Sequence, residues 1–351
     1  MLKKIKISAT NNIIVNAGSK ISNVLNQLNS SKYKTIFIQD KNKRLVGTLT
    51  DGDLRRGFIR GVSLNENLEA ITNINPFFLF DSEIKKKDPN KLNSFLKNKI
   101  KELMIIPILN NKKKIKYFFG FLTDIEKNND DKLPVVIMAG GKGKRLYPLT
   151  SNIPKALVKH KGKPMIEIII ENFSLIGFKN FIFSLGYFSE KILAYLNKIN
   201  KFDVKIDHVI EKKPLGTCGS LYLIKKKLKS DFILINCDVI LELDFNKLVD
   251  FHKKRKSDLT IVTKILKNKS LYGLLNSKGF KVSSIAEKIT DIKKINVGLY
   301  VVSLKLLNLF KKPSYLDMSD FINFVIKKKY KVLTFPIYEN WTDLGLKDNL
   351  I

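Results

Sequence analysis

A glycine-rich, basic loop follows the apolar residues that begin at position 135. It reads Ala139-Gly140-Gly141-Lys142-Gly143-Lys144-Arg145-Leu146. Glycines let backbone N–H groups approach a phosphate chain without interference from Cβ atoms, and three cations within four residues add positive charge. The loop lacks the Gly-Lys-Ser/Thr ending of a P-loop, and Leu146 stands where the dinucleotide fingerprint needs its third glycine. We predict a phosphate-binding loop of another kind, with an ordinary tight turn as the alternative.

Further short motifs follow this loop in one order along the chain. They are Pro154-Lys155-Ala156-Leu157, Gly162-Lys163-Pro164-Met165, Pro214-Leu215-Gly216-Thr217, Asn236-Cys237-Asp238, Glu287-Lys288, Asn296-Val297-Gly298-Leu299-Tyr300 and Trp341-Thr342-Asp343-Leu344-Gly345. Together with the loop, which has the form GGxGxRLxPLT, they cover residues 134–346 and resemble the signature of the sugar-1-phosphate nucleotidyltransferases. Two positions depart from that signature, since Cys218 stands where Ala is common and Ile289 where Pro is usual.

The resemblance implies a role for each matched position. Arg145 would steady the triphosphate, Lys155 would bridge the phosphates near the attack, and Lys288 would hold the incoming sugar phosphate. Asp238 and Asp343 would hold Mg²⁺, which proteins usually bind with one or two carboxylates plus phosphates and water. The nucleotide would contact Ala139, Gly140, Gly141, Gly143, Pro214, Gly216 and Thr217, and the sugar phosphate would contact Glu287, Lys288, Asn296 and Gly298.

The reaction itself explains why these residue types are needed. A sugar phosphate oxygen attacks the α-phosphorus of a nucleoside triphosphate, and both reactants are anions. Positioning and charge neutralisation therefore lower the barrier, and the ionised nucleophile needs no general base. The three histidines, His160, His208 and His252, are interpreted as structural or surface residues. Glu211 is a further candidate for contact with a sugar hydroxyl or a base edge. A helix N-cap at Asp238 and a turn at Asp343 are the structural alternatives to metal binding.

The elements that must position these residues alternate along the chain. Apolar runs at 135–141, 182–186, 204–210, 232–239 and 259–265 predict strands, and the patterns at 164–177, 189–199, 217–229 and 244–256 predict helices. Such alternation favours an α/β fold with a mostly parallel sheet covered on both faces, and ligands bind beyond the carboxyl ends of its strands. The resemblance implies a Rossmann-like, GT-A-like catalytic domain over residues 133–351.

The first part of the chain contains an internal repeat. Residues 43–51 and 116–124 match at Gly47/Gly120, Leu49/Leu122, Thr50/Thr123 and Asp51/Asp124, an offset of 73. Each copy follows an apolar strand-like run (35–38 and 104–109), which in turn follows a helix-like segment (21–30 and 92–102). This order indicates a duplicated unit whose halves share a core. The polar segment 126–134 is a candidate linker to the rest of the chain.

The repeat resembles a CBS-domain pair, an α+β module, over residues 1–128 with copies at about 8–62 and 63–126. The resemblance implies an adenine or guanine nucleotide effector, with Thr50 contacting phosphate and Asp53 contacting ribose hydroxyls. Thr123 is the matching position in the second copy, where Glu126 replaces the aspartate. The alternative is that the pair serves only in dimer packing. We expect a homo-oligomer.

The net charge of +32 invites a nucleic-acid interpretation. Only six of the 64 basic residues are Arg, however, and the Lys residues are spread over the whole chain. We therefore expect a solvated surface that attracts anionic substrates, without nucleic-acid binding. No apolar run approaches the roughly 20 residues that cross a bilayer, and no signal segment is recognisable. These features predict a cytoplasmic protein with no membrane partner.

The order of the two predicted domains indicates a resemblance to one group within this family. A CBS-like pair in front of a short nucleotidyltransferase resembles the glucosamine-1-phosphate guanylyltransferases of legionaminic acid synthesis. The expected reaction joins GTP to glucosamine 1-phosphate to give GDP-glucosamine for nonulosonic acids or surface glycans. A mannose-1-phosphate guanylyltransferase and a glucose-1-phosphate thymidylyl- or cytidylyltransferase are alternatives within enzymes. A catalytically dead nucleotide sensor is the alternative outside them.

Overall fold

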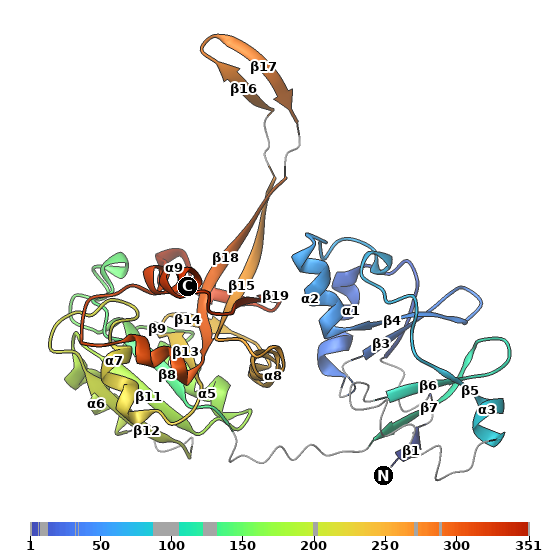
Figure 1. The fold of residues 1–351 in the computed structure, drawn as a ribbon, viewed down its shortest axis with the longest axis horizontal. Coiled ribbons are helices and arrows are strands. Elements are labelled where there is room, and N and C mark those ends of the chain that lie inside the picture. The colour runs from blue at the N-terminus through green and yellow to red at the C-terminus, as the bar shows by residue number, and fades with distance from the viewer. Residues whose placement is uncertain are drawn as a thin grey trace. The chain divides into compact units, whose positions relative to one another are not determined.

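The computed structural model describes residues 2–5, 7, 13–31, 33, 35–86, 105–121, 132–198, 203–269, 273–287 and 290–349. The chain divides into two compact units, residues 1–126 and 127–351 (Figure 1). Thr123, Lys288, Ile289 and the predicted helix at 92–102 lie outside the described residues. Within the described ranges, no helix has the length and apolar character needed to cross a bilayer.

The first unit contains two small sheets with short helices. One sheet has the order β2 (Ile14–Asn16), β3 (Thr35–Gln39) and β4 (Leu45–Thr50), and the other has the order β1 (Leu2–Ile5), β7 (Ile115–Phe121), β6 (Ile105–Leu109) and β5 (Leu79–Phe80). In the first sheet, β2 runs parallel to β3, and β3 forms an antiparallel hairpin with β4. In the second sheet, β5 runs parallel to β6 in the same way, and β6 forms an antiparallel hairpin with β7. The helices of this unit are α1 (Ile21–Ser30), α2 (Asp51–Ile59) and α3 (Asp81–Lys86).

The two hairpins of this unit have equivalent turns. The amide of Asp40 donates to the carbonyl of Arg44, and the amide of Asn110 donates to that of Lys114, each over 2.9 Å. Arg44 and Lys114 also form an antiparallel bridge with each other. Because equivalent residues face each other, a local two-fold axis relates the hairpins. The turns match at an offset of 70, whereas the sequence motifs match at 73, so the second hairpin carries three extra residues before Gly120.

The second unit is built on a seven-stranded sheet. Its order is β12 (Lys205–Ile210), β11 (Asn180–Leu185), β8 (Val135–Ala139), β13 (Phe232–Asn236), β18 (Thr290–Val302), β15 (Leu259–Lys269) and β19 (Val332–Ile337). Every strand runs in one direction except β18, which is antiparallel to both neighbours. The predicted mostly parallel α/β sheet is therefore confirmed for this unit.

Helices cover both faces of this sheet. The side chains of β8 alternate between two apolar clusters, with Val135 and Ile137 in one and Val136 and Met138 in the other. The first cluster includes residues of α5 (Met165–Ser174), α6 (Ser189–Leu196) and α8 (Phe245–Arg255), and the second includes residues of α7 (Leu221–Ile224) and α9 (Met318–Lys327). All five residues of β8 are buried, which explains its continuous apolar sequence.

Two segments differ from the predicted elements. The predicted helix at 217–229 is shorter, with α7 followed by the 3₁₀ turn Lys225–Lys227. Its first residues form a loop instead, because the amides of Cys218 and Gly219 donate to the carbonyl of Leu316. The predicted strand at 259–265 is longer, since β15 and β18 extend beyond the sheet toward a projecting hairpin of β16 (Leu274–Lys278) and β17 (Lys281–Ala286) (Figure 1).

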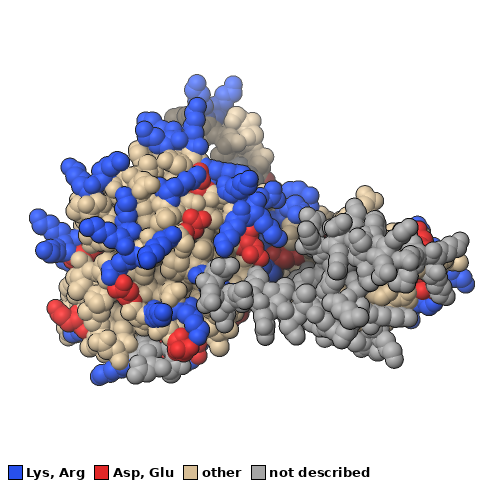
Figure 2. All heavy atoms as spheres, turned by 60° about the horizontal axis from the view of Figure 1, so that its bottom comes forward, with Lys and Arg blue, Asp and Glu red and all other residues tan. Residues whose placement is uncertain are grey.

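Charged side chains are dispersed over the face of the molecule in Figure 2. Figure 2 shows lysine and arginine side chains scattered over the displayed face, with acidic side chains between them. A nucleic-acid footprint gathers such charge in one patch or stripe. The displayed face has the distribution expected of a solvated surface.

Candidate active site

The glycine-rich loop is anchored by Leu146, which stands where the dinucleotide fingerprint has its third glycine. Leu146 is fully buried and packs with Val158, Met165 and Leu344. Gly143 adopts a φ of 65°, and its carbonyl accepts hydrogen bonds from the Leu146 amide and the Thr150 hydroxyl, both at 2.9 Å. The loop leaves β8 and closes in the 3₁₀ turn Lys144–Leu146. Its glycines therefore stay at the surface while its end is fixed in the core.

Asp238 and Asp343 are brought together by a two-stranded sheet. β14 (Val239–Leu241) pairs with β20 (Trp341–Asp343) so that Val239 lies opposite Asp343, and the Leu344 amide donates to the Asp238 carbonyl at 2.9 Å. A Cβ atom placed on Gly345 would lie 2.6 Å from Asp238 Oδ2 and 2.8 Å from Asp343 Oδ1. The two carboxylates thus converge on one point that only a glycine leaves open.

This point has the chemistry of a cation site. The Lys155 ammonium forms an ion pair with Asp238 and lies 3.0 Å from the same Cβ position on Gly345. Within the described part of the chain, no cluster of three or more His, Cys, Asp or Glu side chains could hold a metal alone. Two carboxylates completed by phosphates and water suit Mg²⁺. The residues present therefore fit the predicted ion as a shared site of protein and nucleotide.

Two adjoining cavities lie beside this point. The first has a volume of about 350 Å³ and is lined by Met138, Gly140, Gly141, Arg145, Lys155, Glu211, Pro214, Gly216, Thr217, Asn236, Cys237, Asp238, Tyr315 and Asp317. The second, of about 560 Å³, shares Gly140, Gly141, Glu211, Pro214 and Tyr315 with it and adds Lys142, Gly143, Lys144, Gly186, Tyr187, Lys212 and Lys213. The structure thus gathers most predicted nucleotide contacts around one space, while Ala139 is buried at the end of β8.

The loop at Pro214–Thr217 is held by a residue that the sequence did not reveal. Asp317 Oδ1 accepts a hydrogen bond from the Thr217 amide at 3.1 Å, and this bond holds the pKa of Asp317 below its usual value. Thr217 in turn accepts one from the Met318 amide at 2.8 Å. Gly216 has a φ of 75°, and a Cβ there would meet the Leu316 carbonyl at 2.7 Å. Asp317 directly before an apolar helix indicates a helix start, but no sequence signal gave its partner.

Glu211 lies where the ends of three parallel strands meet. It directly follows β12, and its amide donates to the Leu185 carbonyl of β11 at 2.8 Å. Its carboxylate accepts hydrogen bonds from Ser184 Oγ and the Leu215 amide, both at 3.0 Å. Burial raises the pKa of Glu211. A Cβ on Gly140 would lie 2.6 Å from Glu211 Oε1, so the carboxylate contacts the start of the glycine-rich loop.

Comparison with known proteins agrees with this geometry. Residues 134–351 match the family model described as nucleotidyl transferase. This chain belongs to the nucleotidyl transferase family. It is 32% identical over 219 residues to a mannose-1-phosphate guanyltransferase of Yarrowia lipolytica and 33% identical over 220 residues to that of Saccharomyces cerevisiae. In both, the match covers 60% of this chain and 60% of the relative, so the chain spans about three fifths of their length.

Solved structures of similar fold extend this comparison. HddC from Yersinia pseudotuberculosis, crystallised with GMP-PN, is 30% identical with a TM-score of 0.51, and the match covers 62% of this chain and 96% of HddC. A glucose-1-phosphate thymidylyltransferase of Bacillus anthracis, described as putative, shares the fold at 21% identity and a TM-score of 0.52, with coverage of 62% and 92%. The nucleotidyl transferase fold therefore accounts for the second unit of the chain.

Of the predicted sugar-phosphate contacts, Glu287, Asn296 and Gly298 line neither cavity of this nucleotidyl transferase, and Lys288 lies outside the described residues. Gly298 has a φ of 79°, and a Cβ there would meet Asn236 Nδ2 at 2.7 Å, so it borders a residue that lines the first cavity. Asn296 binds the Tyr300 hydroxyl at 2.6 Å and the Gly298 amide at 3.0 Å. Glu287 is exposed beside Gly273, at the foot of the projecting hairpin. These roles stay predictions.

Proposed function

We propose that this chain transfers a guanylyl group from GTP to a sugar 1-phosphate and releases pyrophosphate. The observation that carries the proposal is the convergence of Asp238, Asp343 and Lys155 beside the glycine-rich loop. The guanine preference is supported by the names of the relatives, which are mannose-1-phosphate guanyltransferases, and by the GMP-PN with which HddC was crystallised.

The chain's own residues supply positioning and charge. Arg145 is exposed at the first cavity and makes no ion pair with any described residue, so its guanidinium is available for the triphosphate. Lys155 adds a second cation, and the loop glycines offer backbone N–H groups. Asp238 and Asp343 would hold Mg²⁺, which neutralises charge on the reacting phosphates when bound. Repulsion between two anions dominates this reaction, so these features address its main barrier.

The sugar is the finer part of the proposal. The relatives favour mannose 1-phosphate, whereas the order of domains in the sequence favours glucosamine 1-phosphate. We rank mannose 1-phosphate and glucosamine 1-phosphate above glucose 1-phosphate, because glucose 1-phosphate belongs only to the thymidylyl and cytidylyl alternatives.

A substrate panel tests the proposal directly. The full chain with Mg²⁺ is incubated with each of GTP, ATP, UTP, CTP and dTTP and each of the three sugar phosphates, and pyrophosphate release is followed. We expect GTP to give the highest kcat/KM with at least one sugar. A highest rate with dTTP or CTP would identify the thymidylyl or cytidylyl alternative. Absence of pyrophosphate with every pair would favour the catalytically inactive sensor.

The first unit carries a separate proposal. We infer a regulatory nucleotide site from the local two-fold axis of its hairpins, which suits a CBS-like pair. Thr50 and Asp53 already have a local role, since they form a capping box at the start of α2, with the Thr50 amide donating to Asp53 at 2.9 Å. Calorimetric titration of the full chain with AMP, ATP and GDP, compared with a Thr50→Ala variant, tests whether this end of α2 also binds phosphate.

A further inference from the structure

The position of Asp343 depends on β20, a strand of only three residues. Among the described strands, β20 pairs only with β14. A ladder of two short strands is marginal on its own, so other contacts must hold the ends of β20. At its carboxyl end, Leu344 is fully buried and its amide donates to the Asp238 carbonyl at 2.9 Å. Asn349 Nδ2 also donates to the Asp343 carbonyl at 2.8 Å.

A lysine of the main sheet holds the other end of β20. Lys264 Nζ of β15 donates to the Glu339 carbonyl at 2.6 Å, and Glu339 lies in the short connection between β19 and β20. One residue later, the Asn340 carbonyl accepts a hydrogen bond from the Glu242 amide at 3.3 Å. Glu242 directly follows β14. The start of β20 is therefore fixed to β15 by a side chain and to the end of β14 by the backbone.

The surroundings of Lys264 explain why it makes this bond. Lys264 is half-buried, and it lies opposite the buried Ile337 of β19 in the ladder. Burial lowers the pKa of Lys264, and the Glu339 carboxylate opposes that shift. An ammonium that is partly removed from water normally needs a hydrogen bond in compensation, which the Glu339 carbonyl supplies. Lys264 lines neither of the two cavities, which favours an indirect role.

The start of β20 matters because Asp343 is the last residue of this strand. The carboxylates of Asp343 and Asp238 converge on the point beside Gly345. If the connection at Glu339 came loose, β20 could shift against β14, and a displacement of about 1 Å at a reacting centre is costly. We propose that Lys264 is a positioning residue, which fixes the start of β20 and so the separation of the two carboxylates that would hold Mg²⁺. This inference rests on the proposed function, since it concerns the cation site of that reaction.

Removal of the ammonium tests this role. Lys264→Met keeps an unbranched apolar stem and removes the donor to Glu339. Binding of GTP to the full chain is measured by calorimetry without a sugar phosphate, once with Mg²⁺ and once with EDTA. The ratio of the two affinities reports the contribution of the ion without turnover. We expect Lys264→Met to lower this ratio about 10-fold, as is common for residues behind metal ligands. The affinity in EDTA should stay within about twofold, because Lys264 does not contact the nucleotide.

Turnover gives a second measurement. The Mg²⁺ concentration for half-maximal pyrophosphate release should rise by about the same factor of 10 in Lys264→Met. Lys264→Arg keeps a cationic donor and should lower the binding ratio less than Lys264→Met does. If Lys264→Met does not fold, as judged by its melting curve, Lys264→Gln keeps a shorter, neutral donor and should lower the same ratio by a smaller factor.

Lys331→Met is the matched control. Lys331 Nζ donates to the Arg255 carbonyl, also at 2.6 Å, but at the amino ends of the parallel strands. This variant loses the same kind of bond, from a lysine to a backbone carbonyl, far from the proposed cation site in the fold of the sheet. It should lower the melting temperature by an amount similar to Lys264→Met and leave the Mg²⁺ ratio unchanged.

The outcomes separate this inference from the proposed function. An unchanged Mg²⁺ ratio in Lys264→Met, or an equal fall in Lys331→Met, would overturn the role of Lys264 even if the wild type releases pyrophosphate. Absence of pyrophosphate release by the wild type, together with Mg²⁺-dependent GTP binding that weakens in Lys264→Met, would contradict the proposed reaction and keep the positioning role. Binding of GTP by the wild type that does not depend on Mg²⁺ would overturn the positioning role as well as the cation site.

Discussion

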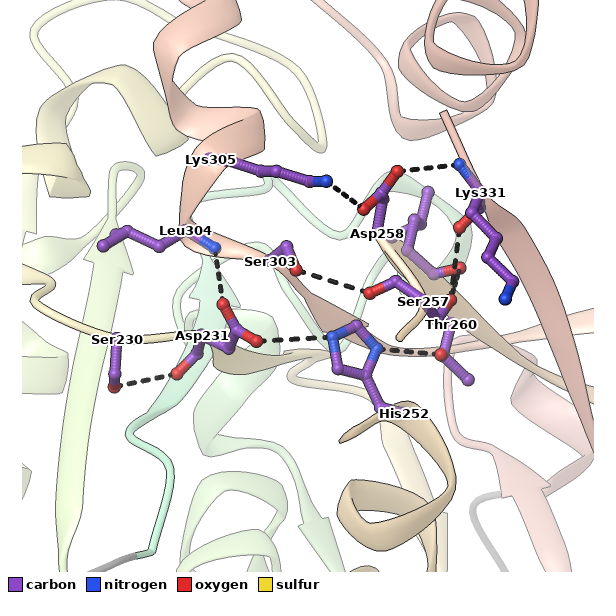
Figure 3. A network of polar contacts seen from close by, with 11 residues as sticks. Ser230, Asp231, His252, Ser257, Asp258, Thr260, Ser303, Leu304, Lys305 and Lys331 are labelled. Atoms are coloured by element: carbon purple, nitrogen blue, oxygen red, sulfur yellow. Dashed lines mark hydrogen bonds and ion pairs between the residues drawn. The ribbon is translucent and has the colours of Figure 1, made fainter. Parts of the chain in front are cut away.

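The two edges of the seven-stranded sheet use polar residues in opposite ways. At the carboxyl edge of the parallel strands, Arg145 is exposed without an ion partner among the described residues, and Glu211 has room for further hydrogen bonds. At the amino edge, a network connects the partly exposed Asp231 with the buried His252 and Thr260 (Figure 3). Both edges are polar, but among the described residues the amino edge pairs its polar groups with one another, whereas Arg145 and Glu211 at the carboxyl edge keep hydrogen-bonding capacity for a ligand.

The amino-edge network joins the ends of several elements. His252 of α8 lies between Thr260 Oγ1 at 2.9 Å and Asp231 Oδ2 at 3.5 Å (Figure 3). Asp258 accepts from the Lys331 amide at 2.8 Å and pairs with Lys305 Nζ at 2.5 Å. These contacts tie α8 and the strand ends together. An Asp–His–hydroxyl arrangement can resemble a catalytic triad, but His252 is buried with 1% exposure, so a substrate has no access.

Both a binding site and a structural network in this fold contain polar residues. They differ in whether those residues keep hydrogen-bonding capacity for a ligand. Exchanging a carboxylate at the carboxyl edge should change activity with little effect on stability. Exchanging one at the amino edge should do the reverse.

The largest expected effect is that of Asp238→Asn. This change removes a charged ligand of the proposed cation site, so we expect kcat/KM to fall by about 10³-fold. The melting temperature should change little, because the Asp238 side chain lines the cavity and pairs with Lys155, and the substitution keeps the backbone bond to Leu344. Pyrophosphate release and thermal melting measure the two quantities on the same sample. Asp231→Asn is the matched control and should keep activity within a few-fold. Loss of activity in Asp231→Asn alone would contradict the comparison.

The next effect concerns the space at Gly345. A Cβ there would lie 2.6 Å from Asp238 Oδ2, 2.8 Å from Asp343 Oδ1 and 3.0 Å from Lys155 Nζ. Gly345→Ala should therefore displace these groups and lower kcat/KM by about 10²-fold. Gly279→Ala is the control for activity, because a Cβ at that hairpin tip meets no atom within 4 Å and the strain at its φ of 60° would act on the stability of the hairpin. Full activity of Gly345→Ala at ordinary Mg²⁺ concentration would mean that the two carboxylates do not share an ion.

The sequence predicted much of the carboxyl edge for a physical reason. Parallel strands bring their carboxyl ends to one edge, so residues following separate apolar runs, such as Gly140 and Asp238, line one cavity. The pairing of Asp238 with Asp343 was also expected, but only from the family resemblance. The small sheet of β14 and β20 joins these residues across 105 positions of sequence and has no local signal.

Other features could not be predicted because their causes are not local. Asp317 accepts a hydrogen bond from the Thr217 amide, 100 residues away in the sequence. The periodicity of apolar residues does not predict such a contact. The reversed direction of β18 depends on its route through the projecting hairpin, which the alternating pattern does not encode. By contrast, the capping box of Thr50 and Asp53 is visible in the spacing of the sequence. The family resemblance assigns these two residues to a ligand, whereas their spacing assigns them to a helix cap.

The pH dependence of stability tests whether the charge of Asp231 stabilises the amino edge. The His252 ring, with Nε2 3.5 Å from Asp231 Oδ2, holds the pKa of Asp231 below its usual value of 3.8. A lowered pKa in the folded state means that ionised Asp231 stabilises the fold above about pH 4, and that this contribution is lost as the pH falls through the lowered value. Because Asp231 is partly exposed, we expect a contribution of about 1 kcal/mol.

Thermal melting of the wild type and Asp231→Asn across pH measures this contribution. The variant should melt about 2–4 °C lower between roughly pH 5 and 7. The difference should shrink as the pH falls through the lowered pKa of Asp231, because the carboxyl of the wild type then becomes neutral as well. A difference that stays constant down to pH 2 would show that the carboxylate charge is not what stabilises the edge.

The smallest expected effect is that of Thr50→Ala, which tests whether Thr50 has a structural role or is open to a ligand. Thr50 caps α2 by accepting a hydrogen bond from the Asp53 amide, and the Asp53 carboxylate binds back to the Thr50 amide. If the pair is structural, like the amino edge, Thr50→Ala should cost about 1 kcal/mol of stability, and Thr50→Ser should restore it. Denaturant unfolding of the full chain, followed by a probe of the first unit, measures this loss. In that structural case, added AMP or GDP should not change the difference between the variants. A nucleotide that stabilises the wild type and not Thr50→Ala would place Thr50 with the available groups of the carboxyl edge, because only a group left open to a ligand transmits binding into stability.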